Sequence, residues 1–158
     1  MGFFRNSYMG IDVGFDSIRV VELRVKASQV QVAKAGMIKT PPQAYDAGIV
    51  LDPSLLAKNL RKLWRNMGLK KRRPVHIAIG GPRIFYRILT IPVIPKRELT
   101  RALEWELEDH FPLSAREAVF DCLPLGNEEG LKGQQGKYLV VAVRREIVAG
   151  YLEALSLA

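Results

Sequence analysis

The stretch Gly10-Ile11-Asp12-Val13-Gly14-Phe15-Asp16-Ser17 decides the fold of the first half of this sequence. A short apolar run, 8–13, leads into it, and an alternating apolar and polar segment, 18–25, follows it. Alternation with period two, rich in β-branched residues, is typical of a β-strand. The stretch therefore predicts a turn between two strands.

The turn carries side chains that suit phosphate chemistry. Asp12 stands at the end of a predicted strand, Gly14 allows a tight turn, and Ser17 supplies a hydroxyl. A carboxylate there can face a metal-bound phosphate while turn N–H groups cradle the phosphate oxygens. The stretch is neither a P-loop nor a Rossmann fingerprint. The pattern alone favours an ordinary hairpin, and a phosphate-binding turn is the alternative.

The rest of the first half predicts a layered α/β arrangement. A third strand is expected over 29–38, a helix over 53–67 and a fourth strand over 75–79. Asp52 suits the N-cap of the helix, and Gly68 suits its left-handed C-terminal stop. Three strands, a crossover helix and a further strand indicate a mixed sheet.

After Pro82 a second pattern begins, of the order β-α-β-β-α. Its expected elements are a strand at 84–91, a helix at 96–110, strands at 119–125 and 137–143 around a Gly-rich turn at 126–136, and a helix from Arg145. That helix still runs at Ala158, as in a piece of a longer protein. The fold class is thus α/β with mixed α+β character, in two subdomains, 1–82 and 83–158.

The helix at 96–110 holds an unusual acidic residue. One helical face carries Leu99, Ala102, Leu103, Leu107 and His110, and Glu106 falls near its centre. A carboxylate in that position must be paired or must face a groove. The pattern favours pairing with His110 or with an arginine such as Arg87. The alternative is that Glu106 receives a polar group of a partner.

The composition excludes several classes of protein. The 158 residues are 48% apolar and 25% charged, unlike a disordered or collagen-like chain. The lone Cys122 excludes a disulfide framework, and the two histidines, His76 and His110, lie far apart in sequence. We predict no catalytic residue. With neither a signal peptide nor a long apolar run, the expected compartment is the cytoplasm.

The formal charge of +8 raises the question of an anionic partner. Part of it is concentrated in the run 70–73, Lys-Lys-Arg-Arg, which precedes Pro74. Such a run favours a solvated loop, with contact to an anionic membrane as an alternative. No aromatic residue interleaves with it to stack bases, so no nucleic-acid partner is predicted.

The order of motifs resembles the PilM family of type IV pilus assembly proteins, which are actin-like ATPases related to the division protein FtsA. The resemblance covers nearly the whole chain. It is carried by the stretch 10–14 with Ser-Ile-Arg-Val-Val-Glu-Leu at 17–23, and by Ala-Ile-Gly-Gly at 78–81, Arg-Ile-Leu-Thr-Ile-Pro at 87–92, Ala-Leu-Glu-Trp-Glu-Leu-Glu at 102–108, Phe-Pro-Leu at 111–113, Phe-Asp at 120–121 and Tyr-Leu-Val-Val-Ala-Val at 138–143.

This resemblance implies part of a ribonuclease-H-like actin subdomain, followed by an inserted small subdomain of the FtsA type. It also implies ATP and Mg²⁺ as cofactors of the intact protein. Asp12 is then the expected metal-facing residue, and the expected nucleotide-binding residues are Asp12, Gly14, Phe15, Asp16 and Ser17. Complete members are about twice as long, and their second phosphate motif comes later, so this chain alone should hold ATP weakly or not at all.

The family's partner is PilN, an inner-membrane protein whose cytoplasmic N-terminal tail lies in a groove between two subdomains. The resemblance implies a cytoplasmic scaffold that is peripheral at the inner membrane through this partner. Whether the chain forms a homo-oligomer is left open. The expected partner-binding residues are Arg87, Ile88, Leu89, Ile91, Val93, Ile94, Leu103, Glu106 and His110. The alternatives are an autonomous FtsA-like ATPase or polymerising scaffold, and the equivalent component of a type II secretion system.

Overall fold

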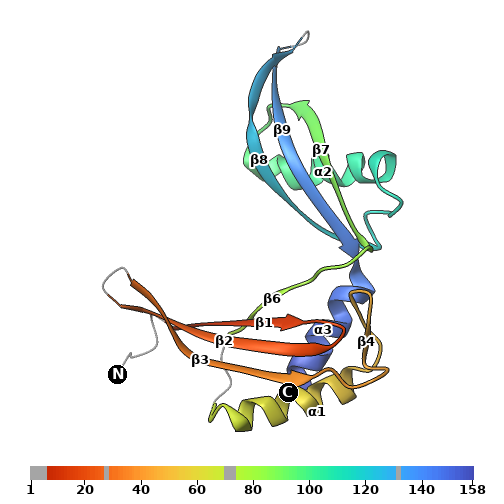
Figure 1. The fold of residues 1–158 in the computed structure, drawn as a ribbon. Helices are drawn as coiled ribbons and strands as arrows, with labels where there is room; N and C mark the ends of the chain where they lie inside the picture. Colours follow the sequence, from red (N-terminus) through yellow and green to blue (C-terminus); the bar gives the residue numbers. More distant parts are fainter. Residues whose placement is uncertain (1–6, 27–28, 70–73, 131–132) are drawn as a thin grey trace. The chain divides into compact units, whose positions relative to one another are not determined.

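The computed structural model describes residues 7–26, 29–69, 74–130 and 133–158, and it divides into two compact units. Unit 1 comprises Met1–Gly81 and Ala149–Ala158, and unit 2 comprises Pro82–Val148. Most elements of both units are labelled in Figure 1. The basic run at 70–73 lies outside the described residues.

Unit 1 is built on a four-stranded sheet. Its strands are β1 (Ser7–Val13), β2 (Ser17–Lys26), β3 (Gln29–Lys39) and β6 (His76–Ala78), in the order β3-β2-β1-β6. The first three pair antiparallel, whereas β6 pairs with β1 in parallel. A parallel pair needs a crossover, which the segment with α1 (Pro53–Asn66) supplies. The predicted mixed sheet is confirmed.

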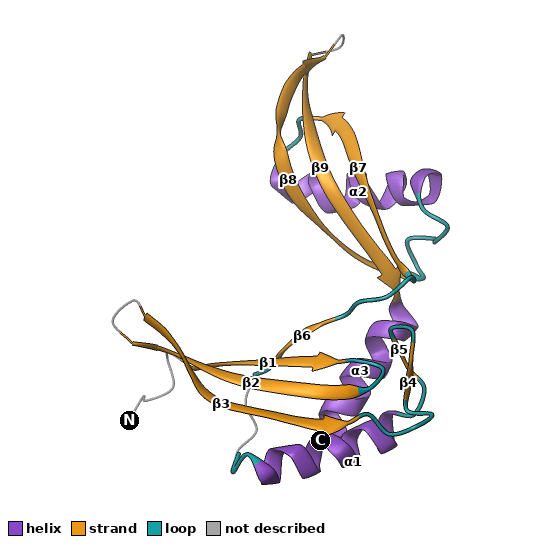
Figure 2. Ribbon diagram, viewed as in Figure 1, coloured by secondary structure: helices purple, strands orange, loops and turns teal. Residues whose placement is uncertain are grey.

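The register of β1 on β2 decides which side of this sheet is buried. It pairs Ile11 with Val20 and Val13 with Ile18, and all four side chains are almost fully buried. Helix α1 packs on this face through Leu56, Leu60 and Leu63 (Figure 2). The tightest approach is at Gly36, where a Cβ atom would lie 2.7 Å from the sulfur of Met67.

Both ends of α1 are capped as the sequence predicts. The Asp52 carboxylate accepts a 2.9 Å hydrogen bond from the N–H of Leu55. At the other end, Gly68 adopts a φ of +63°, and Lys34 Nζ donates to the carbonyl of Met67 at 2.7 Å. The lysine's charge also opposes the negative end of the helix dipole.

A short hairpin in unit 1 escapes sequence analysis. Strands β4 (Tyr45–Asp46) and β5 (Ile49–Val50) enclose a turn in which Ala47 and Gly48 both have positive φ. A Cβ atom on Gly48 would lie 2.2 Å from the Gly80 carbonyl oxygen. This close approach requires glycine at position 48, and Gly81 is required as well, since its φ is +129° and a Cβ atom there would lie 2.7 Å from the Ala47 carbonyl oxygen.

Unit 2 is a three-stranded antiparallel sheet with one helix on one face. Its strands are β7 (Ile84–Pro92), β8 (Ala118–Gly130) and β9 (Gly133–Arg144), in the order β7-β9-β8. Helix α2 (Lys96–His110) has the predicted bounds. The core of unit 2 consists of Leu89, Ile91, Leu103, Leu107, Phe111, Leu113, Ala118, Tyr138, Val140 and Ala142.

The prediction of a Gly-rich turn over 126–136 is wrong. The two strands continue as a paired ribbon, with Asn127 opposite Gly136 and Gly130 opposite Gly133. A register shift between Pro124 and Gly126 inserts an extra residue in β8. The polar composition indicated a loop, but continued ladder pairing satisfies the backbone groups of the ribbon.

Helix α3 (Arg145–Leu157) was expected to belong wholly to the second subdomain, and the structure differs. Residues Ala149–Ala158 belong to unit 1. There the Tyr151 side chain is almost fully buried, and its hydroxyl donates a 3.1 Å hydrogen bond to the Gly48 carbonyl. A hydrogen bond over such a sequence separation leaves no local signal in the sequence.

We predict that Tyr151→Phe lowers the free energy of unfolding by about 1–3 kcal/mol, because the buried Gly48 carbonyl loses its donor. Burial raises the pKa of Tyr151, so the unfolded chain releases this proton first as the pH rises past about 10. Urea unfolding should therefore show the wild type losing stability above that pH, with a smaller loss in the variant. The exposed Tyr86→Phe is the control, and equal effects of the two changes would contradict the account.

Candidate functional site

The turn after β1 is tied to the end of β3. Gly14 N–H donates to the Ser17 carbonyl at 3.0 Å, and Thr40 Oγ1 donates to the Gly14 carbonyl at 2.6 Å. The Thr40 N–H adds a 3.0 Å bond to the Asp16 carbonyl. Sequence analysis identified the turn but missed Thr40, which the pairing of β3 with β2 brings beside it.

Asp12 is not a free carboxylate. It stands opposite Arg19 in the β1–β2 register, and the Arg19 guanidinium lies 3.1 Å from its oxygen. Both side chains are more than half exposed, so the pair contributes little to stability. Once the turn is placed, the antiparallel register predicts this pairing, so the signal was present in the sequence.

The remaining turn residues leave donors available for an anion. Phe15 and Asp16 are exposed, and their backbone N–H groups form no hydrogen bond with a described residue. Ser17 is buried. The two available amides suit a phosphate, whereas a Mg²⁺ ion bound to that phosphate would have to displace Arg19 from the Asp12 carboxylate. In the described part of the chain no cluster of three His, Cys, Asp or Glu residues could hold a metal alone.

A shallow apolar cavity of about 620 Å³ adjoins Asp12 on the exposed face of the same sheet. Gly10, Val21, Ala35 and Met37 line it together with the Asp12–Arg19 pair. Gly10 and Ala35 leave room for the cavity, because their side chains are smaller than those of their neighbours on the strands. It lies on the face opposite to α1 and contains few polar groups.

The structure separates the residues predicted to bind a partner. Leu89, Ile91 and Leu103 are almost fully buried and hold α2 on its sheet. Arg87, Ile88 and Val93 are exposed, and Ile94 is half-buried. Ile88 points to the face of the sheet opposite to α2, since Leu89 on its neighbouring position is in the core. The predicted set therefore does not form one continuous surface.

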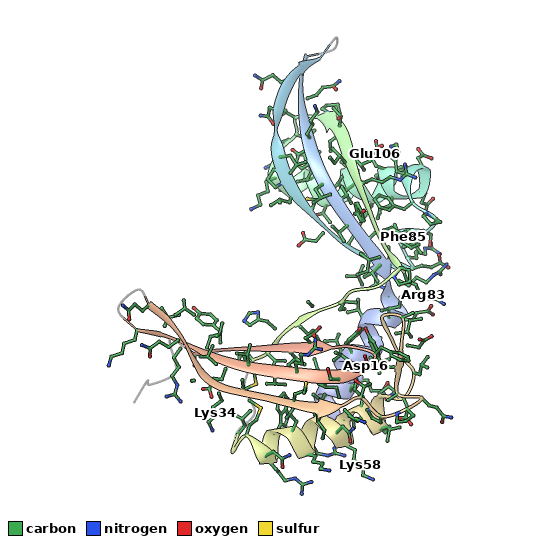
Figure 3. All side chains as sticks on the ribbon, in the orientation of Figure 1. Asp16, Lys34, Lys58, Arg83, Phe85 and Glu106 are labelled. Carbon is green, nitrogen blue, oxygen red and sulfur yellow. The ribbon has the colours of Figure 1, made fainter. Side chains whose placement is uncertain are left out.

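Glu106, labelled in Figure 3, lies on α2 at the margin of its buried face. Its side chain is 39% exposed and pairs with His110, with 3.2 Å between Glu106 Oε2 and His110 Nε2. Leu103 and Leu107 form the buried stripe instead. The prediction of a central position is wrong, because Glu106 lies at the margin of this stripe, and the paired interpretation holds.

Sequence analysis missed an apolar surface on the outer face of the unit 2 sheet. Tyr86 and Ile88 on β7, Leu123 on β8 and Val141 on β9 are all exposed there. The register places Tyr86 and Asp121 on either side of Val141, and Ile88 and Leu123 on either side of Leu139. Strand β7 is also an edge strand, so one side of its backbone is open to pairing.

The Cys122 thiol is a poor candidate for a nucleophile. Burial raises the pKa of the Cys122 thiol, and the Asp121 carboxylate raises it further, which disfavours a nucleophilic thiolate. No helix in the described part of the chain has the length and apolar character needed to cross a membrane.

Comparison with known proteins identifies the family. The family model for the type IV pilus assembly protein PilM matches residues 10–158. The chain belongs to the PilM family. No curated protein matches it.

Among solved structures, the chain is similar to PilM in the PilM–PilN type IV pilus biogenesis complex. The TM-score is 0.82 at 29% identity, over 96% of this chain and 44% of that one. The cytoplasmic domain of EpsL, an inner-membrane component of the type II secretion system of Vibrio cholerae, shares the fold. There the TM-score is 0.59 at 17% identity, over 95% of this chain and 52% of that one. The chain thus spans less than half of the PilM chain that it matches.

We predict that Glu106→Ala changes the free energy of unfolding by less than about 0.5 kcal/mol, because its partner His110 is also well exposed. The matched variant, Leu107→Ala on the same helix, should cost about 2–5 kcal/mol, since Leu107 is fully buried. Denaturant unfolding measures both. A loss at Glu106 as large as that at Leu107 would mean that Glu106 is a structural residue.

Proposed function

We propose that this PilM-family chain is a cytoplasmic scaffold component of the type IV pilus machinery and binds the N-terminal cytoplasmic tail of a PilN-like inner-membrane protein. The observation that carries the proposal is its likeness to PilM of the PilM–PilN complex, over nearly the whole of this chain. The partner brings the chain to the inner membrane.

The open edge of β7 is the proposed docking element. An extended peptide that adds to this edge gains main-chain hydrogen bonds, and its side chains alternate between the two faces of the sheet. On one face it would meet Tyr86 and Ile88, which are 73% and 61% exposed. Such a strand explains how residues on opposite faces, Ile88 and Arg87, can belong to one recognition site.

Residues after β7 and near the end of α2 are proposed as further contacts of the peptide. Val93 and Ile94 follow the strand; Val93 is exposed, whereas Ile94 packs partly against the core of unit 2. Glu106 and His110 are proposed as polar contacts, because their pair is accessible and can exchange partners. Leu89, Ile91 and Leu103 support the site from the core rather than by contact.

ATP and Mg²⁺ are proposed as ligands of the intact family member. Asp12 would face the metal, and the turn of Gly14, Phe15, Asp16 and Ser17 would face the phosphates. The free N–H groups of Phe15 and Asp16 support this assignment. When bound, the metal would neutralise phosphate charge, and the Asp12 carboxylate would exchange Arg19 for the metal.

Nucleotide binding separates this proposal from the alternative of an autonomous FtsA-like ATPase. We predict that calorimetry of the 158-residue chain with ATP and Mg²⁺ detects no micromolar binding, because the turn at 14–17 is the one phosphate motif recognised in this sequence and the second motif of complete members comes later. A full-length member should bind, and Asp12→Ala should weaken that binding. Micromolar affinity for the short chain would favour the autonomous ATPase.

We predict that Ile88→Asp lowers the affinity for a labelled peptide with a PilN-like N-terminus by about tenfold or more. The substitution places a charge on the apolar contact surface. Val30→Asp is the matched control, because Val30 is a similarly exposed β-branched residue of an edge strand in unit 1. Fluorescence anisotropy measures both. Equal affinities of the two variants would contradict docking on β7, and lack of binding by the wild type and a full-length member would end the proposed function.

A further inference from the structure

Helix α1 carries a ridge of positive charge on its outer face. Lys58, Arg61, Lys62 and Arg65 follow the spacing i, i+3, i+4 and i+7, and all four are exposed. At 100° per residue this spacing confines them to one face, and the ridge is about 10 Å long. We call these four residues the α1 ridge. Figure 3 shows Lys58 projecting from α1 away from the sheet.

The solubility of an exposed helix face does not explain the ridge, because all of its charges are positive. No Asp or Glu occurs in Pro53–Asn66. By contrast, α2 of unit 2 has five acidic residues against three basic ones. A solvated helix face normally mixes both signs, which adds favourable pairs at i and i+4.

The charges of the ridge are also available. Arg61 donates a hydrogen bond to the Leu157 carbonyl, which holds its guanidinium near the C-terminal end of α3. The side chains of Lys58, Lys62 and Arg65 form no ion pair or hydrogen bond with any residue that the structure describes. Like charges on one face repel each other, so the helix keeps an unfavourable term that an anionic surface would remove.

We propose that the α1 ridge lies against an anionic phospholipid bilayer. The inference rests on the proposed function, which brings the chain to the inner membrane through its partner. Basic residues on an amphipathic helix are attracted by anionic lipid headgroups, each contributing about a fivefold gain in affinity near the surface. The formal charge of +8 adds a longer-range attraction of the same sign.

A bilayer fits this ridge better than nucleic acid does. The apolar side of α1, with Leu56, Leu60 and Leu63, is buried against the sheet, so the helix cannot insert into a groove as a free element. Trp64 is half-buried, and Asn59 donates to the Lys39 carbonyl, so neither serves as a free stacking or base-reading group. A straight row of cations suits a flat layer of phosphates.

The test is co-sedimentation of the 158-residue chain with vesicles of phosphatidylcholine, with and without phosphatidylglycerol. The triple variant Lys58→Gln, Lys62→Gln, Arg65→Gln removes three charges and keeps good helix formers. Its matched control, Arg97→Gln, Arg101→Gln, Arg116→Gln, removes the same charge from exposed positions of unit 2. Unfolding curves of both variants confirm that they fold.

We expect binding only to vesicles with phosphatidylglycerol, falling on the order of 100-fold in the α1 variant and much less in the control. Added salt should weaken it. Equal losses in the two variants, or no binding by the wild type, would overturn the proposal. It would also be overturned if the α1 variant lost affinity for duplex DNA but kept its affinity for vesicles.

The same α1 variant separates this inference from the proposed function. It should bind the PilN-like peptide as tightly as the wild type, because its changes lie in unit 1 and the peptide site lies on β7 of unit 2. Normal peptide binding with unchanged vesicle binding would refute the α1 ridge alone. Loss of peptide binding in the wild type would refute the proposed function, whatever the vesicles show.

Discussion

The antiparallel register of β1 on β2 is the constraint on which unit 1 depends. Side chains alternate along a strand, so a shift by one residue would turn every buried side chain towards solvent. In the observed register Val13 and Ile18 are buried together, and Asp12 faces Arg19 on the outside. Thr40 then fixes the turn through its bond to the Gly14 carbonyl. The core, the ion pair and the candidate phosphate turn thus follow from one alignment.

Unit 2 leaves part of its antiparallel sheet uncovered. One helix covers one face of three strands, and the other face and the β7 edge stay open. An exposed edge and an exposed apolar surface both carry a risk of aggregation. A scaffold that receives an extended tail has a use for both, since the tail pairs with the edge while its side chains cover the apolar residues.

Local signals were enough to predict much of this structure. The bounds of α2, the caps of α1 and the crossover that makes β6 parallel all follow from periodicity and from cap residues such as Asp52 and Gly68. The β4–β5 hairpin could not be predicted, because it depends on the backbone approach of Gly48 to Gly80. The membership of α3 in unit 1 depends on the distant Tyr151–Gly48 bond. The burial of Leu89 and Ile91, and the exposure of Ile88, required knowing which face α2 covers.

The central claim is that β7 receives an extended peptide, and hydrogen exchange tests it most directly. Amides on the open side of an edge strand exchange freely until another strand pairs with them. Upon addition of a PilN-like N-terminal peptide, the account predicts new protection of alternate amides within Ile84–Pro92, while the equivalent edge strand β3 of unit 1 stays unchanged. Saturating peptide without any new protection in β7 would contradict it.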